Sequence, residues 1–181
     1  MSTLATLVHL RWAVPVLAEL HRGYGGRFVN LTHNLGVGRE SLSRTLAFLT
    51  EAGLVRRNPG HGHPLRPEYL LTEAGAQLAE PAAALTNLLR ELGASDVGLK
   101  KWSLPILVLL TAGERRFSEL RNALPGTSNR ALTLALKDLE SAELVTRTVT
   151  TGYPPTTSYG ATHTGLRLAH AAEQLQLRTP G

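Results

Sequence analysis

The stretch that decides the fold is residues 116–139, which read RFSELRNALPGTSNRALTLALKDL. Apolar residues recur at helical spacing in two runs, first Phe117, Leu120 and Leu124, and then Leu132, Leu136 and Leu139. Pro125-Gly126 ends the first run, because proline cannot donate a backbone hydrogen bond and glycine supplies a turn. Thr127-Ser128 caps the second run. The stretch therefore predicts a helix-turn-helix.

The flanks of this stretch extend the pattern. Upstream, a further helix is predicted, which Ser95 or Asp96 could cap and Gly113 ends; its apolar positions are Trp102, Ile106, Leu109 and Leu110. Downstream of Leu144 the period becomes alternating, and Val145, Arg147 and Val149 predict one half-buried strand. The turn at 152–155 leads into a returning strand through Tyr159. A β-hairpin behind a helix-turn-helix is a winged helix.

The first half of the chain repeats this scheme. A shift of ninety positions carries Arg11-Trp12 to Lys101-Trp102, and it also relates Leu42, Leu46, Leu49, Tyr69, Thr72 and Gly75 to Leu132, Leu136, Leu139, Tyr159, Thr162 and Gly165. The first copy thus predicts a helix through Trp12, a second helix over 28–35, a turn at 36–38, a third helix and a hairpin over 54–71. We expect two domains of one kind, over residues 1–93 and 94–181, and a function that requires two copies of this domain.

A further helix follows each hairpin. After Pro81, leucines form one apolar stripe at Leu85, Leu88, Leu89 and Leu92, and the C-terminal helix offers Leu168, Ala171, Ala172 and Leu175. The stripes could pack on each other, cover their own domains or pair with a second chain. Residues 93–96 read as the linker. The predicted fold class is mainly α with small β-hairpins (α+β), as two tandem winged helix-turn-helix domains joined through helices.

Composition narrows the function classes. The chain has 181 residues, a net charge of +5 and no cysteine, which excludes disulfides and thiolate metal sites. Its apolar runs are shorter than a bilayer requires, and no secretory signal is visible, so we expect no membrane partner and a cytoplasmic location. Residues 1–78 hold eight arginines against five acidic residues, and residues 98–181 hold ten Lys and Arg against six. Two basic halves favour a polyanionic partner, although a basic charge alone also fits an ordinary soluble protein.

The second copy resembles the HxlR-type winged-helix transcriptional regulators, which are relatives of the MarR group. The resemblance rests on Lys101-Trp102, Arg116–Leu120, Leu124–Ser128, Leu144-Val145 and the hairpin's Tyr153-Pro154-Pro155 with Tyr159. The first copy diverges at Gly36-Val37-Gly38 but keeps Trp12, Arg27-Phe28 and Tyr69–Thr72. The resemblance implies a homodimer with one domain per chain, and a tandem chain departs from that pattern. This chain could work as a monomeric pseudo-dimer or as a homodimer.

In a helix-turn-helix the second helix enters the major groove of double-stranded DNA, and its outward side chains meet base edges. The outward positions are predicted to be Arg39, Glu40, Ser43 and Arg44 in the first copy, and Ser128, Asn129, Arg130, Thr133 and Lys137 in the second. The arginines suit guanine or phosphate, Asn129 suits adenine, and Ser43 and Thr133 could donate to phosphate. Leu134 takes the place of Arg44, so the two copies are expected to read unequal half-sites.

The hairpins are predicted to neutralise phosphates along the backbone or in the minor groove. The residues concerned are Arg56, Arg57, His61, His63 and Arg66 in the first copy, and Arg147 with its neighbouring threonines in the second. His61-Gly62-His63 could bind a metal, but two imidazoles without a third ligand are more often plain loop residues. We therefore expect no metal site.

No catalytic constellation is visible, and no cofactor is expected. Gly36-Val37-Gly38 follows a predicted helix rather than a strand, which excludes a dinucleotide fingerprint. Trp12 and Trp102 read as core anchors, and a pocket beside them would suit a small-molecule effector. Two functions stay open. The chain is either a sequence-specific DNA-binding transcriptional regulator that uses its two winged helices as a pseudo-dimer, or a tandem winged-helix module that binds a protein and little or no DNA.

Overall fold

The computed structural model of the chain describes residues 3–23, 26–59, 67–151, 153 and 155–177. The chain divides into two compact units: unit 1 comprises Met1–Asn87 with Gln174–Gly181, and unit 2 comprises Leu88–Glu173. The division falls inside a helix, α5 (Glu73–Glu91). Within the described ranges, no helix combines the length and the apolar character that crossing a membrane requires.

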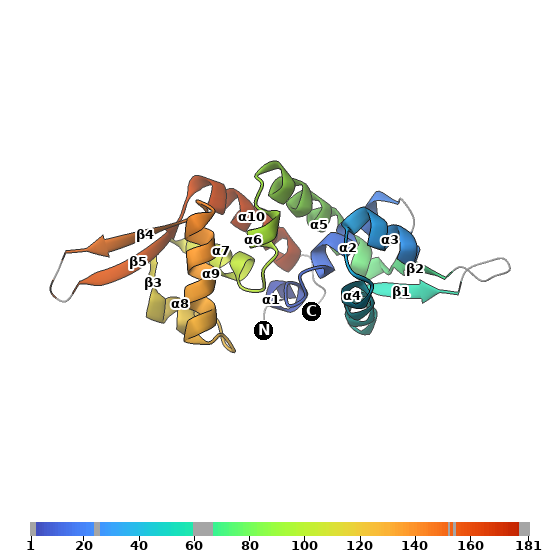
Figure 1. Ribbon diagram of the computed structural model, residues 1–181, viewed down its shortest axis with the longest axis horizontal. Coiled ribbons are helices and arrows are strands. Elements are labelled where there is room, and N and C mark those ends of the chain that lie inside the picture. The colour runs from blue at the N-terminus through green and yellow to red at the C-terminus, as the bar shows by residue number, and fades with distance from the viewer. Residues whose placement is uncertain (1–2, 24–25, 60–66, 152, 154, 178–181) are drawn as a thin grey trace. The chain divides into compact units, whose positions relative to one another are not determined.

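Unit 1 is mostly helical with one small antiparallel sheet (Figure 1). Its elements are α1 (Thr3–Leu7), α2 (Ala13–Arg22), α3 (Phe28–Leu35), α4 (Arg39–Glu51), β1 (Val55–Asn58), β2 (Glu68–Leu71) and the first part of α5. Strands β1 and β2 pair in the register Val55↔Leu71 to Asn58↔Glu68. Helices α3 and α4 with this hairpin form the predicted winged helix.

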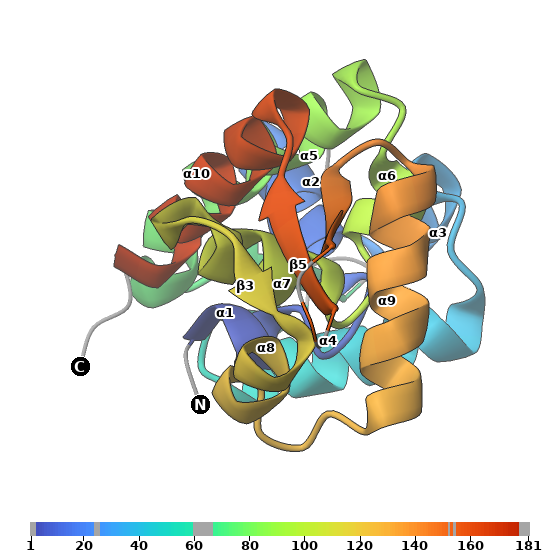
Figure 2. The ribbon, with the colours of Figure 1, turned by 90° about the vertical axis from the view of Figure 1, so that its left-hand side faces the viewer.

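Unit 2 repeats the order with a three-stranded sheet, ordered β3-β5-β4 (Figure 2). Its elements are α6 (Ser95–Gly98), α7 (Ser103–Leu109), the 3-10 helix η1 (Leu110–Ala112), β3 (Arg115–Arg116), α8 (Phe117–Ala123), α9 (Asn129–Ser141), β4 (Val145–Thr150), β5 (Thr156–Ala161) and α10 (His163–Leu177). The predicted fold class, two tandem winged helix-turn-helix domains, is confirmed.

The two units share one device that joins the hairpin to the following helix. Thr72 donates its hydroxyl to the Gly53 carbonyl at 2.6 Å, and Thr162 donates its hydroxyl to the Glu143 carbonyl at 2.8 Å. Each threonine oxygen also accepts the N–H three residues on, from Gly75 at 3.1 Å and from Gly165 at 3.0 Å. The threonine therefore satisfies groups on both sides of the junction.

The predicted start of the first helix in the second copy is wrong. Ser95 and Asp96 belong to the separate four-residue helix α6, and the helix that follows Trp102 begins only at Ser103. Pro105 explains the late start, because a proline without an N–H is tolerated in the first turn of a helix and disrupts its interior. Pro15 has the same place in α2, which begins at Ala13.

One further expectation differs from the structure, and one helix is longer than its apolar stripe. Helix α5 begins at Glu73 and continues through Pro81, so the leucine stripe after that proline occupies the second half of the helix. Strand β4 is buried only at Val145, and Val149 is 52% exposed, so the strand is not half-buried. The hairpin of β4 and β5 extends beyond α8 and α9 (Figure 1), and alternation alone does not reveal where a covering layer ends.

The trailing helices carry the predicted apolar stripes. In α5, Leu85 and Leu89 are buried while Leu88 and Leu92 are half-buried. In α10 the buried stripe residues are Leu168, Ala172 and Leu175, and Ala171 is half-buried. The partner of each stripe stays a prediction.

Candidate nucleic-acid interface

Helix α4 separates an apolar face from a polar one. Its buried residues are Leu42, Thr45, Leu46 and Leu49, which follow the 3.6-residue period. The predicted contact residues on the other face are all exposed: Arg39, Glu40, Ser43 and Arg44. The core contacts of the leucines therefore fix which side chains of α4 face solvent.

Two contacts hold the cations of α4. The Arg39 guanidinium lies over the Phe28 ring of α3, 5.7 Å from its centroid. Arg44 pairs with Glu40, one turn earlier, with 3.1 Å between Nη2 and Oε1. Because the Arg44 and Glu40 side chains are 66% and 89% exposed, this pair contributes little stability, and a phosphate or base can displace it.

Helix α9 presents the corresponding face of unit 2. Ser128 caps it, since its Oγ accepts the Ala131 N–H at 3.1 Å, and the predicted contact residues Ser128, Asn129, Arg130, Thr133 and Lys137 are all exposed. Thr133 donates its hydroxyl to the Asn129 carbonyl at 2.8 Å. Donation from Thr133 to a phosphate therefore requires another rotamer.

The two exposed faces differ in charge. At the shift of ninety, Arg130 replaces Glu40, Leu134 replaces Arg44, and Lys137 replaces Ala47. Leu134 is 52% exposed, so it lies on the outer face of α9 and is not a core residue. The first face combines two arginines with a carboxylate, whereas the second combines two cations with an apolar side chain.

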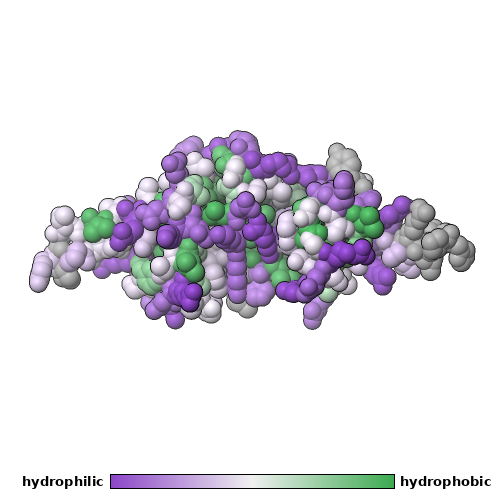
Figure 3. Space-filling view, in the orientation of Figure 1, coloured by the Kyte–Doolittle hydropathy of each residue, from purple (hydrophilic) through white to green (hydrophobic). Residues whose placement is uncertain are grey.

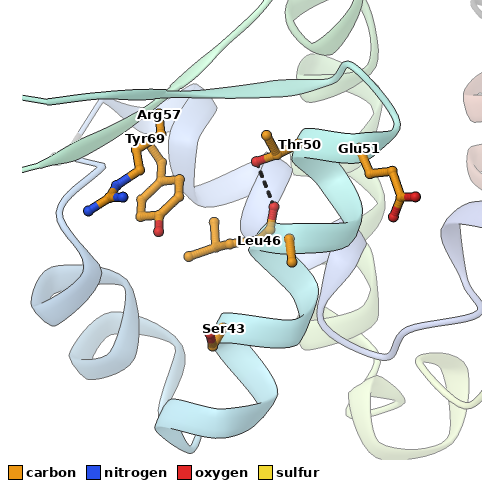
Figure 4. A pocket seen from close by; sticks show the side chains of 7 residues that line it. Ser43, Leu46, Thr50, Glu51, Arg57 and Tyr69 are labelled. Carbon is orange, nitrogen blue, oxygen red and sulfur yellow. Dashed lines mark hydrogen bonds between the residues drawn. The ribbon is translucent and has the colours of Figure 1, made fainter.

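The structure separates the two arginines of the first hairpin. Arg57 is the register partner of Tyr69 and Arg56 that of Leu70, so their side chains leave opposite faces of the hairpin. Arg57 and Tyr69 line a hollow of about 420 Å³ together with Ser43 of α4 (Figure 4). Arg57, but not Arg56, therefore lies beside α4. The predicted residues Arg66, His61 and His63 lie outside the described residues.

In the second hairpin, Arg147 is exposed and is the register partner of Tyr159. The threonines beside it are partly engaged within the hairpin: Thr146 donates to the Gly160 carbonyl at 3.3 Å, and Thr150 bonds to Thr156. Arg147 is therefore the side chain of this hairpin best placed to neutralise a phosphate.

Two residues of this surface were missed by sequence reasoning. Arg121 of α8 donates through Nε to Oδ1 of Asn129 at 3.0 Å, which holds the first residue of α9. Tyr69 lines the hollow beside Arg57. The match of Tyr69 with Tyr159 in the repeat was a signal for the tyrosine. Arg121 has no such signal: Arg116-Phe117 matches Arg27-Phe28 at a shift of eighty-nine, and at that shift Thr32 stands at the position of Arg121.

Each tryptophan lies directly before the helix that precedes its helix-turn-helix, α2 or α7, and is half-buried. The Arg11 guanidinium lies 5.8 Å from the Trp12 ring centroid, and the Lys101 ammonium lies 4.8 Å from that of Trp102. Over the described residues, no group of three or more His, Cys, Asp or Glu side chains could hold a metal ion. Figure 3 shows a largely hydrophilic face with small scattered apolar patches.

Comparison with known proteins places the chain in a family. The model of the HxlR-like helix-turn-helix family matches residues 7–96 and again residues 97–178. An uncharacterized HTH-type transcriptional regulator of Mycobacterium tuberculosis is 46% identical over 72 residues, which are 40% of this chain and 45% of that protein. One of Synechocystis is 42% identical over 99 residues, which are 55% of this chain and 71% of that protein.

Among solved structures, a MarR-family transcriptional regulator of Enterococcus faecalis is 30% identical, with a TM-score of 0.42, over 51% of this chain and 78% of its own. The chain spans less than half the length of the mycobacterial relatives that it matches. The two family matches together cover almost all of the chain. The chain belongs to the HxlR-like helix-turn-helix family and carries that family's domain twice.

Proposed function

We propose that the chain is a sequence-specific, double-stranded DNA-binding transcriptional regulator whose two winged helices act as a pseudo-dimer. The observation that carries the proposal is that both copies expose the predicted contact residues of a recognition helix and also an arginine of the following hairpin, Arg57 in one and Arg147 in the other. Phosphate contacts from such cations supply affinity, and side chains in the major groove supply sequence preference. The names of the relatives support the same function.

The proposed contact residues divide between these two roles. Base edges are assigned to Arg39, Arg44, Asn129 and Arg130, and phosphates to Ser43, Arg56, Arg57, Arg66, Ser128, Thr133, Lys137 and Arg147. Because Leu134 stands in place of Arg44, the two half-sites are unequal in this proposal. A perfect palindrome would then be a poorer target than an asymmetric site.

The proposed domains are 1–93 and 94–181, which the family matches to 7–96 and 97–178 support. Each domain takes one half-site, with centres about 34 Å apart if they mimic a two-fold dimer. A regulator of this kind acts where the chromosome lies, so we propose a cytoplasmic location. Sedimentation at micromolar concentration tests the working unit: a monomer supports the pseudo-dimer, and a dimer implies four winged helices on a longer site.

A fluorescence anisotropy titration tests DNA binding. Random-sequence and genomic duplexes are titrated at about 50 and 200 mM salt, and a protein with six or more phosphate contacts loses roughly 10³-fold or more in affinity between them. Tighter binding of some genomic fragments than of random duplexes supports the regulator. Absence of binding at the lower salt overturns it and favours the protein-binding module, for which the exposed Leu134 and Val149 of unit 2 would be the first contacts to test.

A further inference from the structure

The hollow between α4 and the hairpin of unit 1 is a site with a defined chemistry. Helix α4 lines it with Ser43, Leu46, Ala47, Thr50 and Glu51, and the two strands contribute Arg57 and Tyr69. Figure 4 shows the Arg57 and Tyr69 side chains on one side of α4 and the Glu51 carboxylate on the other. The cation and the phenol therefore lie at one end of the hollow, away from Glu51, which is the one carboxylate among its described lining residues.

The donors at this end are unused. Among the described residues, the Arg57 guanidinium and the hydroxyls of Ser43 and Tyr69 have no hydrogen-bond partner. Tyr69 is half-buried, and a tyrosine hydroxyl in such a place usually finds an acceptor. Thr50 differs, since it donates its hydroxyl to the Leu46 carbonyl at 2.8 Å. Three unused donor groups, one of them a cation, fit an anion with several acceptor oxygens.

The same donor set recurs in unit 2. Arg147 and Tyr159 are register partners, as Arg57 and Tyr69 are, and Thr133 supplies a hydroxyl at the position of Ser43. Other lining positions have diverged between the copies: Ala47, Thr50 and Glu51 correspond to Lys137, Glu140 and Ser141. The arginine and tyrosine are thus retained where their neighbours changed. Arg57 and Arg147 are exposed, so core packing does not account for their retention.

DNA geometry places an anion at this hollow. If α4 lies in the major groove and the hairpin lies along the adjacent minor groove, the sugar-phosphate strand that separates the two grooves must pass between helix and hairpin. We propose that Arg57, Tyr69 and Ser43 form a seat for one backbone phosphate, and that Arg147, Tyr159 and Thr133 form its counterpart in unit 2 after a rotamer change of Thr133. This inference rests on the proposed DNA-binding function and adds Tyr69 and Tyr159 as phosphate ligands.

The test uses the full chain and a duplex selected from a random library by the wild-type protein. Tyr69→Phe removes one neutral donor, so we expect affinity to fall about 3- to 10-fold on every duplex alike, with an unchanged salt slope. Arg57→Ala removes a cation, so the salt slope should also fall by about one. Thr50→Val is the matched control: it lines the same hollow but uses its hydroxyl internally, so its affinity should equal that of wild type.

A second arm replaces single phosphates of the duplex by neutral methylphosphonates and compares the wild-type protein with the Tyr→Phe variants. One replacement per half-site should lower the affinity, and on that duplex Tyr69→Phe or Tyr159→Phe should cost nothing further. Wild-type affinity of both folded Tyr→Phe variants, or a methylphosphonate penalty that adds fully to theirs, would overturn the seat while DNA binding stands. Absence of DNA binding by the wild type would overturn the proposed function and the seat together.

Discussion

Glu143 lies at φ 55°, at the position where Gly53 of the first copy lies at φ 69°. Each residue follows a recognition helix, and its carbonyl accepts the hydroxyl of the threonine directly before the next helix. In the left-handed region a residue with a Cβ is destabilised by steric repulsion, whereas glycine is not. Glu143 is the sole non-glycine residue with positive φ in the described part of the chain. The second copy thus carries a backbone strain that the first avoids.

Glu143→Gly should therefore raise the free energy of unfolding by roughly 0.5–1 kcal/mol, because relief of the strain exceeds the entropy that glycine adds to the unfolded chain. Urea denaturation followed by circular dichroism measures the change. The matched variant Gly53→Glu should lower the stability of the first copy by a similar amount. An equal or lower urea midpoint for Glu143→Gly would show that the junction imposes no strain.

Two hydroxyls of unit 2 are buried without a hydrogen-bond partner among the described residues, those of Ser103 and Thr127. The first copy has apolar residues at the corresponding positions, Ala13 and Val37, which are also buried. Since an unsatisfied buried hydroxyl costs about 1–3 kcal/mol, we expect Ser103→Ala and Thr127→Val each to stabilise unit 2 by about 1 kcal/mol.

Thr162→Val is the control for Thr127→Val, because it makes the same substitution where the hydroxyl is used. It removes the bonds of Thr162 to the Glu143 carbonyl and the Gly165 N–H. The free energy of unfolding should fall by about 1–2 kcal/mol, and thermal denaturation compares the two variants directly. Destabilisation by both to the same extent would mean that the Thr127 hydroxyl has a partner after all.

Gly75 and Gly165 lie in the first turn of α5 and of α10, close to the backbone that follows each recognition helix. A Cβ on either glycine would overlap a backbone carbonyl oxygen, of Leu54 or Leu144 respectively. Gly75→Ala and Gly165→Ala should each destabilise their unit by about 1–3 kcal/mol, since backbone must move to make room. Gly38→Ala is the control, because its Cβ would meet nothing within 4 Å and its φ is −64°. Urea midpoints near that of wild type for all three would refute the close approach.

The sequence predicted those parts of the fold that depend on local pattern. The apolar faces of α4 and α9 and the cap at Ser128 follow from periodicity and capping chemistry, and all are present. Periodicity could not locate the start of α7, because Ser95 and Asp96 are good caps for a helix that Pro105 prevents from starting there.

Part of the candidate surface was predictable because it too depends on local periodicity. Outward positions of a helix follow from its buried ones, so the exposed residues of α4 and α9 were found. Contacts between elements were not found, because they depend on tertiary packing: the pairing of Arg57 with Tyr69 sets which face Arg57 leaves, and the bond from Arg121 to Asn129 joins two helices. A register and an inter-helix distance have no signature in composition or spacing.

Glu40 places a negative charge on a face proposed to meet DNA. Glu40→Gln removes that charge and releases Arg44, so affinity for random-sequence duplexes should rise about 2- to 5-fold at low salt, as for a favourable change of roughly 0.5–1 kcal/mol. Anisotropy titrations measure it. Glu91→Gln is the control: Glu91 is also exposed and pairs with Arg167, but it belongs to α5 and not to a recognition helix, so its loss should change nothing. Equal gains in both variants would point to net charge alone.

Arg121 and Asn129 offer the sharpest test of positioning at the second recognition helix. Oδ1 of Asn129 accepts from Arg121 while its Nδ2 stays available, so the bond fixes the orientation of an amide proposed to read adenine. Arg121→Ala, Asn129→Ala and the double variant form a cycle on the selected duplex. If Arg121 acts through Asn129, its removal should cost about 1 kcal/mol of binding in the presence of Asn129 and much less in its absence. Arg121→Ala should also weaken the preference for adenine at one position, whereas loss of a phosphate contact would weaken all sequences alike. Full additivity in the cycle, with an unchanged base preference, would reduce Arg121 to an independent phosphate contact.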